Sequence, residues 1–428
     1  MLVEFRFKNY RSFRDETVLS VEAMGFAAFK DCLLEHNSKK ILPLVSVYGK
    51  NGGGKSNVIR AFWVAVQFIR NAHRMQHENA TVPVTPFALN DYSANEPTEF
   101  EFVYIVGDIK YWYSFAATTE KIVKESLYYA PKGQKSKVFI RKGQQFSFSG
   151  EVLKRNLISQ AVAENQLYFS VACILNDPIC INAIKWFREN IFFSRNYRDI
   201  PLQLLDFSND SKMLKVISDY AKIADLGIEE MQFAMGERGA EEDIESLNGM
   251  KSAIGSFIQG LSENSNAVEA KFKDSQIKAT ARYRGINANG ESDLYSLEIE
   301  EESDGAKKWL ALASVMDVVL SRGGVLLVDG IEEDLHPLLI HYIIARFQSR
   351  KSNSKGAQLI FTTHNTDLMN LKFMRKDQIY FADKNKKDGV SKLFRMTEVK
   401  ARKTDNKCRC YLAGKYGAVP DIEIKQIN

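Results

Sequence analysis

The sequence has little cysteine and no long apolar run. Five cysteines are present, and their spacing matches no metal motif, since Cys408 and Cys410 stand one residue too close for a zinc knuckle. We therefore expect free thiols in a reducing cytoplasm. No stretch approaches the roughly 18 uninterrupted apolar residues of a membrane-spanning helix. The opening MLVEFRFKNYRSF carries charges every few residues, unlike a signal peptide or a membrane anchor. These absences predict a cytoplasmic protein without a membrane partner.

A strong excess of one charge is also absent. The 428 residues include 58 Lys and Arg against 53 Asp and Glu, a net charge of +5. Proteins that bind nucleic acid through its phosphates usually carry clustered positive charge, whereas the two signs are mixed here. The charge balance therefore permits contact with nucleic acid but does not argue for it.

Hydrophobic periodicity divides the chain into three parts. Residues 1–150 contain alternating and apolar runs that predict strands at 2–8, 18–21 and 41–48, and antiparallel strands within 98–147. Residues 151–275 show helical periodicity with few strand signals and predict a helical insertion. In residues 276–428, strands at 277–284 and 295–300 precede alternating helix and buried strand. We therefore expect an α/β core with a mixed or parallel sheet, flanking helices, an antiparallel β lobe and a helical insertion.

The strongest local motif is a phosphate-binding loop at Gly49–Ser56. Its letters, GKNGGGKS, match G-x-x-x-x-G-K-[ST] at every fixed position, between a predicted buried strand and a predicted helix. Glycines let successive backbone N–H groups converge on phosphate oxygens, and the helix N-terminus adds partial positive charge. Lys55 would neutralise the β- and γ-phosphates, and the Ser56 hydroxyl would bind Mg²⁺. The motif predicts that the chain binds ATP and Mg²⁺.

A carboxylate that completes the metal site is expected on a neighbouring strand. The run GVLLVD ends in Asp329, at the carboxyl end of a predicted buried strand, where ligands bind in open α/β sheets. We expect Asp329 to bind Mg²⁺ directly or through water. A capping Asp at the end of a strand is the alternative interpretation.

Two further positions could face the nucleotide. His364 follows the predicted strand QLIFTT and could sense the γ-phosphate, although single histidines often serve packing. Ser303 precedes a helix that begins near Gly305, where free N–H groups could meet an anion. An ordinary capped helix would give the same pattern.

Together these residues resemble an ABC-type ATPase of the SMC/RecF-like branch. In particular, the chain resembles the AAA-named ATPases of bacterial phage-defence loci, the RloA and abortive-infection group. The resemblance covers most of the chain and rests on FRFKNYRSFRDE, GKNGGGKSN, SDGAKK, the stretch from VD to LHP at 328–337, and THN at 363–365. Two late segments, RKDQIY and YLAGKYGAVP, also look like that group.

The resemblance implies an ATPase whose active sites form between two copies of the chain. Two molecules would enclose two ATPs, so that the phosphate loop of one copy faces Ser303–Lys307 of the other. Binding would hold the dimer and hydrolysis would release it, and higher homo-oligomers are also compatible. The implied nucleotide-binding residues are Arg11, Gly49, Lys50, Asn51, Gly52, Gly53, Gly54, Lys55, Ser56, Asn57, Ser303, Gly305 and Lys307. Lys55, Asp329 and His364 are the implied catalytic residues, and an exposed edge arginine is the alternative interpretation of Arg11.

One position departs from the family pattern. The residue after the Walker B aspartate is normally a glutamate that orients the attacking water, and here it is Gly330. Loss of a water-positioning group lowers the rate by orders of magnitude and leaves binding intact. Glu332 and Glu333 lie close in the sequence, but the strand end would have to shift by two or three residues to aim either of them at the water. We therefore expect tight ATP binding and slow hydrolysis.

Two functions fit these expectations. The first is an ATP-gated sensor or scaffold in phage defence that controls a separate effector, a nuclease from the same locus. The segment 365–428 is short for a nuclease domain and lacks the spaced acidic cluster of a two-metal nuclease. The alternative is a RecF/SMC-like repair ATPase that binds DNA through basic runs at 39–40, 132–142 and 384–392, although such runs are often solvated turns. A transporter ATPase fits poorly, because no membrane-coupling segment is evident.

Overall fold

The chain folds into two compact units. The computed structural model describes residues 1–26, 29–36, 39–75, 80–194, 211–235, 277–399 and 406–420. Unit 1 comprises Met1–Arg195 and Met316–Asn428, and unit 2 comprises Asn196–Val315. Unit 1 is thus assembled from two segments that are far apart in the sequence.

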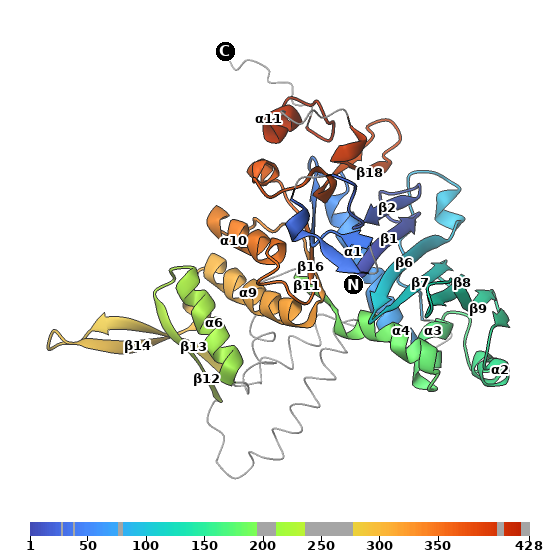
Figure 1. Cartoon of the computed structure of the whole chain (residues 1–428), viewed down its shortest axis with the longest axis horizontal. Coiled ribbons are helices and arrows are strands. Elements are labelled where there is room, and N and C mark those ends of the chain that lie inside the picture. Colours follow the sequence, from blue (N-terminus) through green and yellow to red (C-terminus); the bar gives the residue numbers. More distant parts are fainter. Residues whose placement is uncertain are drawn as a thin grey trace, which may run out of the picture. The chain divides into compact units, whose positions relative to one another are not determined.

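The first sheet of unit 1 has seven strands in the order β10-β9-β8-β7-β6-β1-β2, and every neighbouring pair is antiparallel. Figure 1 shows β1, β6, β7, β8 and β9 following one another across this sheet. The strands are β1 Leu2–Lys8, β2 Thr17–Ser20, β6 Thr98–Val106, β7 Ile109–Ala117, β8 Ile122–Ala130, β9 Ser136–Lys142 and β10 Gln145–Phe148. The antiparallel strands expected within 98–147 are confirmed.

The second sheet has six strands in the order β11-β15-β16-β5-β17-β18. All neighbours are parallel except β18, which runs antiparallel to β17. Every residue of β5, β15 and β16 is buried, as expected for strands covered on both faces. The strands are β5 Leu44–Tyr48, β11 Ile191–Ser194, β15 Val325–Val328, β16 Gln358–Thr362, β17 Ile379–Lys384 and β18 Ser391–Arg395.

Helix α1, Lys55–Asn71, packs between the two sheets. Its apolar residues include Phe62, whose ring centroid lies 4.8 Å from that of Phe5 in β1 and 6.2 Å from that of Phe193 in β11. Aromatic rings that meet at such distances bury large apolar areas. The core of unit 1 therefore holds the amino end of α1 in a defined position.

Helices α2 (Val152–Gln160), α3 (Tyr168–Ile174) and α4 (Pro178–Glu189) also belong to unit 1. Arg155 Nε donates 2.7 Å to Asp177 Oδ2, and Asp177 caps α4 by accepting from the N–H groups of Ile179 and Cys180. Buried Glu125 in β8 accepts hydrogen bonds from the first N–H groups of α3, which ties these helices to the seven-stranded sheet.

Unit 2 contains α6 (Ser211–Ile223) and a three-stranded antiparallel sheet, β12-β13-β14. Its strands are β12 Ile228–Met235, β13 Ile277–Ile286 and β14 Ser292–Glu298. Helix α9, Asp304–Arg322, begins in unit 2 and ends in unit 1. Within unit 2, the indole N–H of Trp309 donates 2.7 Å to the carbonyl of Tyr220, which joins α9 to α6.

The expected helical insertion, 151–275, contains both helices and strands. The structure describes its residues 151–194 and 211–235, where the short strands β11 and β12 lie beside the helices and were not predicted from periodicity. The described residues 151–194, with helices α2–α4 and strand β11, belong to unit 1, and the described residues 211–235 belong to unit 2. The division into 1–150, 151–275 and 276–428 as functional parts stays a prediction.

The other described elements are short or peripheral. They are β3 Leu34–His36, β4 Lys39–Ile41, α10 Pro337–Gln348, α11 Lys407–Leu412 and the 3-10 helices Lys30–Cys32, Ala72–Arg74, Ser93–Asn95, Ile299–Glu301, Thr366–Asn370, Lys376–Gln378 and Met396–Glu398. Within the described ranges, no helix has the length and apolarity to cross a membrane. The predicted α/β fold with a mixed sheet and an antiparallel lobe is confirmed.

Candidate functional site

The candidate site lies where three neighbouring parallel strands end. Strands β15, β16 and β5 are adjacent, and their register pairs Val328 with Phe361 and Thr362 with Val47. The residues that follow these strands therefore meet at one edge of the sheet. This edge is where ligands bind in open α/β sheets.

The phosphate loop joins β5 to α1 and is packed against β17. A Cβ atom at Gly49, which has a φ of 151°, would lie 2.1 Å from the carbonyl oxygen of Ala382, and one at Gly53 would lie 2.6 Å from it. Only glycine fits such approaches without displacing backbone. Gly54 then caps α1, and Lys50 Nζ lies 2.8 Å from Asp383 Oδ1, while Asn51 and Gly52 form an exposed tip.

Lys55 directs its ammonium group into the loop. Its Nζ donates to the carbonyl oxygens of Gly49, at 2.9 Å, and Lys50, at 3.1 Å. Burial lowers the pKa of Lys55, and the negative charges of Glu332 and Asp329 oppose that shift. A buried cation inside a ring of backbone groups suits a polyanionic ligand.

Asp329 and Ser56 come together as the sequence predicts. Ser56 Oγ donates 3.0 Å to Asp329 Oδ1, and the Thr362 hydroxyl donates 2.6 Å to the same oxygen. The Thr362 oxygen in turn accepts the Gly330 N–H at 2.8 Å. Among the described residues, no group of three or more His, Cys, Asp or Glu side chains is placed to hold a metal. One carboxylate beside one hydroxyl fits Mg²⁺, which takes few protein ligands and completes its shell with phosphate and water oxygens.

His364 and Glu332 lie in contact with each other beside the phosphate loop and Asp329. The backbone N–H of His364 donates to Glu332 Oε1 at 2.5 Å. Burial lowers the pKa of the His364 imidazole, the positive charge of Lys55 lowers it further, and Glu332 opposes both. The imidazole therefore stays largely neutral near pH 7.

Sequence reasoning gave Thr362 no role of its own and considered Glu332 only as a carboxylate that a shift of the strand end would have to re-aim. Thr362 counted only as part of the setting of His364 at the end of a buried strand. The contacts of Thr362 and Glu332 with Asp329 and His364 cross between neighbouring strands. A signal for Thr362 was its place immediately before Thr363 and His364, at the end of a strand beside the expected site.

The turn that carries Arg11 is fastened to the phosphate loop. Asn57 Nδ2 donates 2.8 Å to Ser12 Oγ, and the ring of Phe13 packs against Gly54. Arg11 itself is exposed and has a φ of 51°, and its guanidinium group lies over the ring of Tyr10. The turn is thus placed beside the loop, and contact of Arg11 or Asn57 with a nucleotide stays a prediction.

Ser303 caps α9 in unit 2. Its hydroxyl accepts the N–H of Ala306 at 3.2 Å, and its carbonyl accepts the N–H of Lys307 at 3.0 Å. The helix begins at Asp304, one residue before the predicted start at Gly305. The capping role is confirmed, and contact of Ser303, Gly305 and Lys307 with the nucleotide of a second copy stays a prediction.

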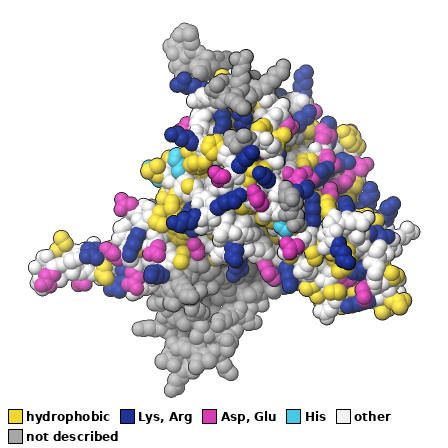
Figure 2. Space-filling model, in the orientation of Figure 1, with side chains coloured by type: hydrophobic (Ala, Val, Ile, Leu, Met, Phe, Trp, Pro, Cys, Tyr) yellow, Lys and Arg dark blue, Asp and Glu magenta, His cyan; other side chains and the backbone are white. Residues whose placement is uncertain are grey.

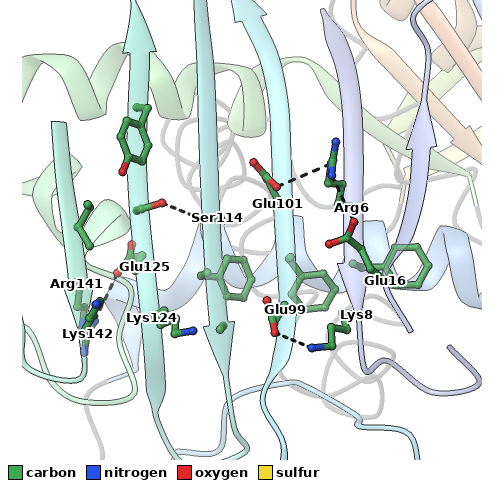
Figure 3. Close-up of a pocket in the computed structure, with 17 residues that line it drawn as sticks. Arg6, Lys8, Glu16, Glu99, Glu101, Ser114, Lys124, Glu125, Arg141 and Lys142 are labelled. Carbon is green, nitrogen blue, oxygen red and sulfur yellow. Dashed lines mark hydrogen bonds and ion pairs between the residues drawn. The ribbon is translucent and has the colours of Figure 1, made fainter. Parts of the chain in front are cut away.

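A separate depression of about 280 Å³ lies on the seven-stranded sheet (Figure 3). Several of its charges are paired with one another, as in Lys8 with Glu99 and Arg6 with Glu101. Such cross-strand pairs are typical of a solvated sheet face. We assign no ligand to this depression.

The basic runs that could contact DNA are partly engaged with other side chains. Lys39 Nζ lies 2.5 Å from Glu22 Oε1, and Lys135 Nζ lies over the rings of Trp112 and Tyr128. Figure 2 shows basic and acidic side chains interspersed on the drawn face. These observations give the DNA-binding alternative no specific support.

Comparison with known proteins identifies a family. The family model described as "AAA domain, putative AbiEii toxin, Type IV TA system" matches residues 44–370. No curated protein matches the sequence. An Smc head bound to the C-winged helix domain of ScpA is 16% identical, with 92% of this chain and 97% of that chain covered and a TM-score of 0.43. An Smc head with an extended coiled coil, bound to the C-terminal domain of ScpA derived from Pyrococcus furiosus, is 16% identical, with coverage of 92% and 96% and a TM-score of 0.38.

A post-hydrolysis ATP-binding cassette dimer bound to ADP and Pi is 11% identical, with coverage of 92% and 98% and a TM-score of 0.28. These structural similarities are weak, and the assignment rests on the family model. That model spans well over half of the 428 residues and includes the phosphate loop, Asp329 and His364. The expected resemblance to abortive-infection ATPases is confirmed. The chain belongs to this AbiEii-type AAA domain family of ATPases.

Proposed function

We propose that the protein is an ATP-gated sensor or scaffold that controls a separate effector, a nuclease, in bacterial anti-phage defence. The observation that carries the ATP-binding part of the proposal is the convergence of Lys55, Ser56 and Asp329 at the carboxyl edge of three parallel strands. The family's description as a toxin of a toxin–antitoxin system supports a role in controlling damage to the cell.

ATP binding follows from the groups around the loop. The Lys55 ammonium group exchanges the carbonyl oxygens of Gly49 and Lys50 for the β- and γ-phosphates, and the loop N–H groups bind the remaining phosphate oxygens. Ser56 and Asp329 hold Mg²⁺, which neutralises charge on the phosphate oxygens when it is bound. His364, two residues after the end of β16, senses the γ-phosphate.

ATP controls the activity of the protein through the association of two copies of the chain. Ser303, Gly305 and Lys307 of one copy approach the nucleotide held by the other, so that ATP binds the paired state more tightly than the single chain. A ligand shifts an equilibrium only by such a difference in affinity. ATP binding therefore holds the dimer, and hydrolysis releases it.

Hydrolysis is slow, because the position that usually supplies the water-orienting glutamate is Gly330, and another carboxylate has to act from a different point of the turn. A slow step prolongs the ATP-bound dimer, which suits a signal that must persist until an effector has responded. In this proposal, exposed residues of 151–275 contribute a surface for oligomerisation or for docking the effector.

The test is reconstitution with the neighbouring genes of the native locus. The tagged chain should retain a nuclease partner in the presence of ATP and Mg²⁺, and Lys55→Ala should lose it. Recovery of the chain without any second protein, with ATP bound, would contradict effector control but not ATP binding. Salt-dependent DNA binding by the chain alone would favour the RecF/SMC-like alternative.

A further inference from the structure

The backbone after Asp329 disfavours a side chain at position 330. Gly330 has a φ of 65°, and a Cβ atom there would lie 2.4 Å from Glu333 Oε1. A residue with a side chain is strained in this left-handed conformation. The family's usual glutamate at this position would therefore carry backbone strain and would have to displace the side chain of Glu333.

The same turn brings another carboxylate to the site. The Ile331 N–H donates 3.1 Å to the Thr362 carbonyl, and the Glu333 N–H donates 3.1 Å to the Gly330 carbonyl. The chain thus folds back towards β16, and Glu332 Oε1 accepts the N–H of His364. Glu332 is held at the strand end that also carries the expected γ-phosphate sensor.

The second oxygen of this carboxylate has no hydrogen-bond partner. Glu332 Oε2 is buried, and no donor among the described residues reaches it. Leaving a buried acceptor unpaired is unfavourable, and more so when the group is charged. The charge of Glu332 also acts on Lys55 more strongly than that of Asp329 does. Glu332 Oε2 therefore lies near the phosphate-binding lysine and lacks a hydrogen-bond donor. The attacking water of ATP hydrolysis can be that donor.

We propose that Glu332 positions the attacking water and accepts its proton, in place of the side chain that is missing at Gly330. The proposal rests on the proposed ATP binding. The water oxygen forms a bond to the γ-phosphorus as the bond from that phosphorus to the bridging oxygen breaks, and the bond's electron pair stays on ADP. The water proton passes to Glu332 Oε2 and then to the departing phosphate.

The decisive variant is Glu332→Gln, which keeps the size of the side chain and an oxygen for the His364 N–H. We expect hydrolysis to fall by roughly 100-fold or more, the range of a lost general base. ATP affinity measured by calorimetry should stay within about threefold. The lifetime of the ATP-bound dimer, followed by size-exclusion chromatography with Mg²⁺ and ATP, should increase.

The matched control is Glu333→Gln, one residue along the same turn on an exposed side chain, which should keep the wild-type rate. Gly330→Glu should bring no gain in rate, because Glu332 already serves the water. A Glu332→Gln protein that hydrolyses ATP at the wild-type rate, or that loses ATP binding as well, overturns the proposal.

The test separates this proposal from the proposed function. If the wild-type chain binds ATP but releases no more phosphate than Lys55→Ala, Glu332 activates no water and only the present inference fails. If the wild-type chain binds no ATP, the proposed function fails together with it.

Discussion

The Thr362 hydroxyl donates a hydrogen bond of 2.6 Å to Asp329 Oδ1. The same hydroxyl oxygen accepts the Gly330 N–H, so that one side chain of β16 holds both the carboxylate and the turn that follows β15. Groups that orient a metal-binding carboxylate contribute to metal affinity although they do not touch the metal. Thr362 is therefore a positioning residue of the proposed Mg²⁺ site.

Thr362→Val should weaken the dependence of ATP binding on Mg²⁺. The variant keeps the shape of the side chain but removes the donor to Asp329 and the acceptor of the Gly330 N–H. We expect the half-saturating Mg²⁺ concentration to rise by roughly 10- to 100-fold. A titration of Mg²⁺ against a fluorescent ATP analogue measures it. Thr363→Val is the control, because its hydroxyl accepts the N–H of Asn365 instead. Equal Mg²⁺ dependence of ATP binding in both variants would contradict the role of Thr362 in positioning Asp329.

Lys55→Ala should weaken ATP binding without unfolding the chain. In the described residues, the Lys55 ammonium group donates only to the loop carbonyls of Gly49 and Lys50, so its removal leaves the core intact. A charged hydrogen bond is worth about 1.5–3 kcal/mol, which predicts roughly a 10- to 100-fold loss of affinity by calorimetry. Lys8→Ala, which removes an exposed ion pair with Glu99 outside the loop, should leave the affinity unchanged. Undiminished ATP binding by Lys55→Ala would refute the site.

Asp177→Ala should destabilise unit 1. Asp177 is fully buried, is paired with Arg155, and caps α4. Removing one partner of a buried ion pair costs about 3–5 kcal/mol, because the other charge is left unpaired. Denaturant unfolding measures the loss. Lys8→Ala removes only an exposed pair with Glu99 and should change stability by about 0–1 kcal/mol. If Asp177→Ala and Lys8→Ala lose similar amounts of unfolding free energy, the buried Arg155–Asp177 pair does not stabilise unit 1 more than a surface pair does.

Lys407 should make stability depend on pH in the alkaline range. Burial, with a smaller effect of Lys376, lowers the pKa of Lys407 from 10.5 to about 8. Between these two values the unfolded chain binds more protons than the folded chain, so this group makes stability rise with pH. We expect the stability of the wild type relative to Lys407→Met to increase between pH 7 and pH 10. The carbonyls of Met369 and Met374 lose their donor at every pH in the variant, so that loss does not alter the trend. A pH-independent difference would contradict the lowered pKa.

Much of the site could be predicted from local sequence. The loop Gly49–Ser56 and the strand that ends at Asp329 each carry their signal in a few consecutive residues, and the structure brings Ser56 within 3.0 Å of Asp329 Oδ1. The short strands β11 and β12 were missed, because four to eight residues within a helical context give little periodicity.

By itself the sequence determined the type of site, a glycine loop and one lysine for phosphates with a hydroxyl and a carboxylate for a metal, since these requirements are local. Only the tertiary structure decided which other groups join them. The strand order β15-β16-β5 places Thr362 beside Asp329, the left-handed turn at Gly330 carries Glu332 to His364, and Ala382 of β17 enforces glycine at positions 49 and 53. The physical reason is that contacts between neighbouring strands depend on register and on backbone conformation, which residues far apart in the chain set together.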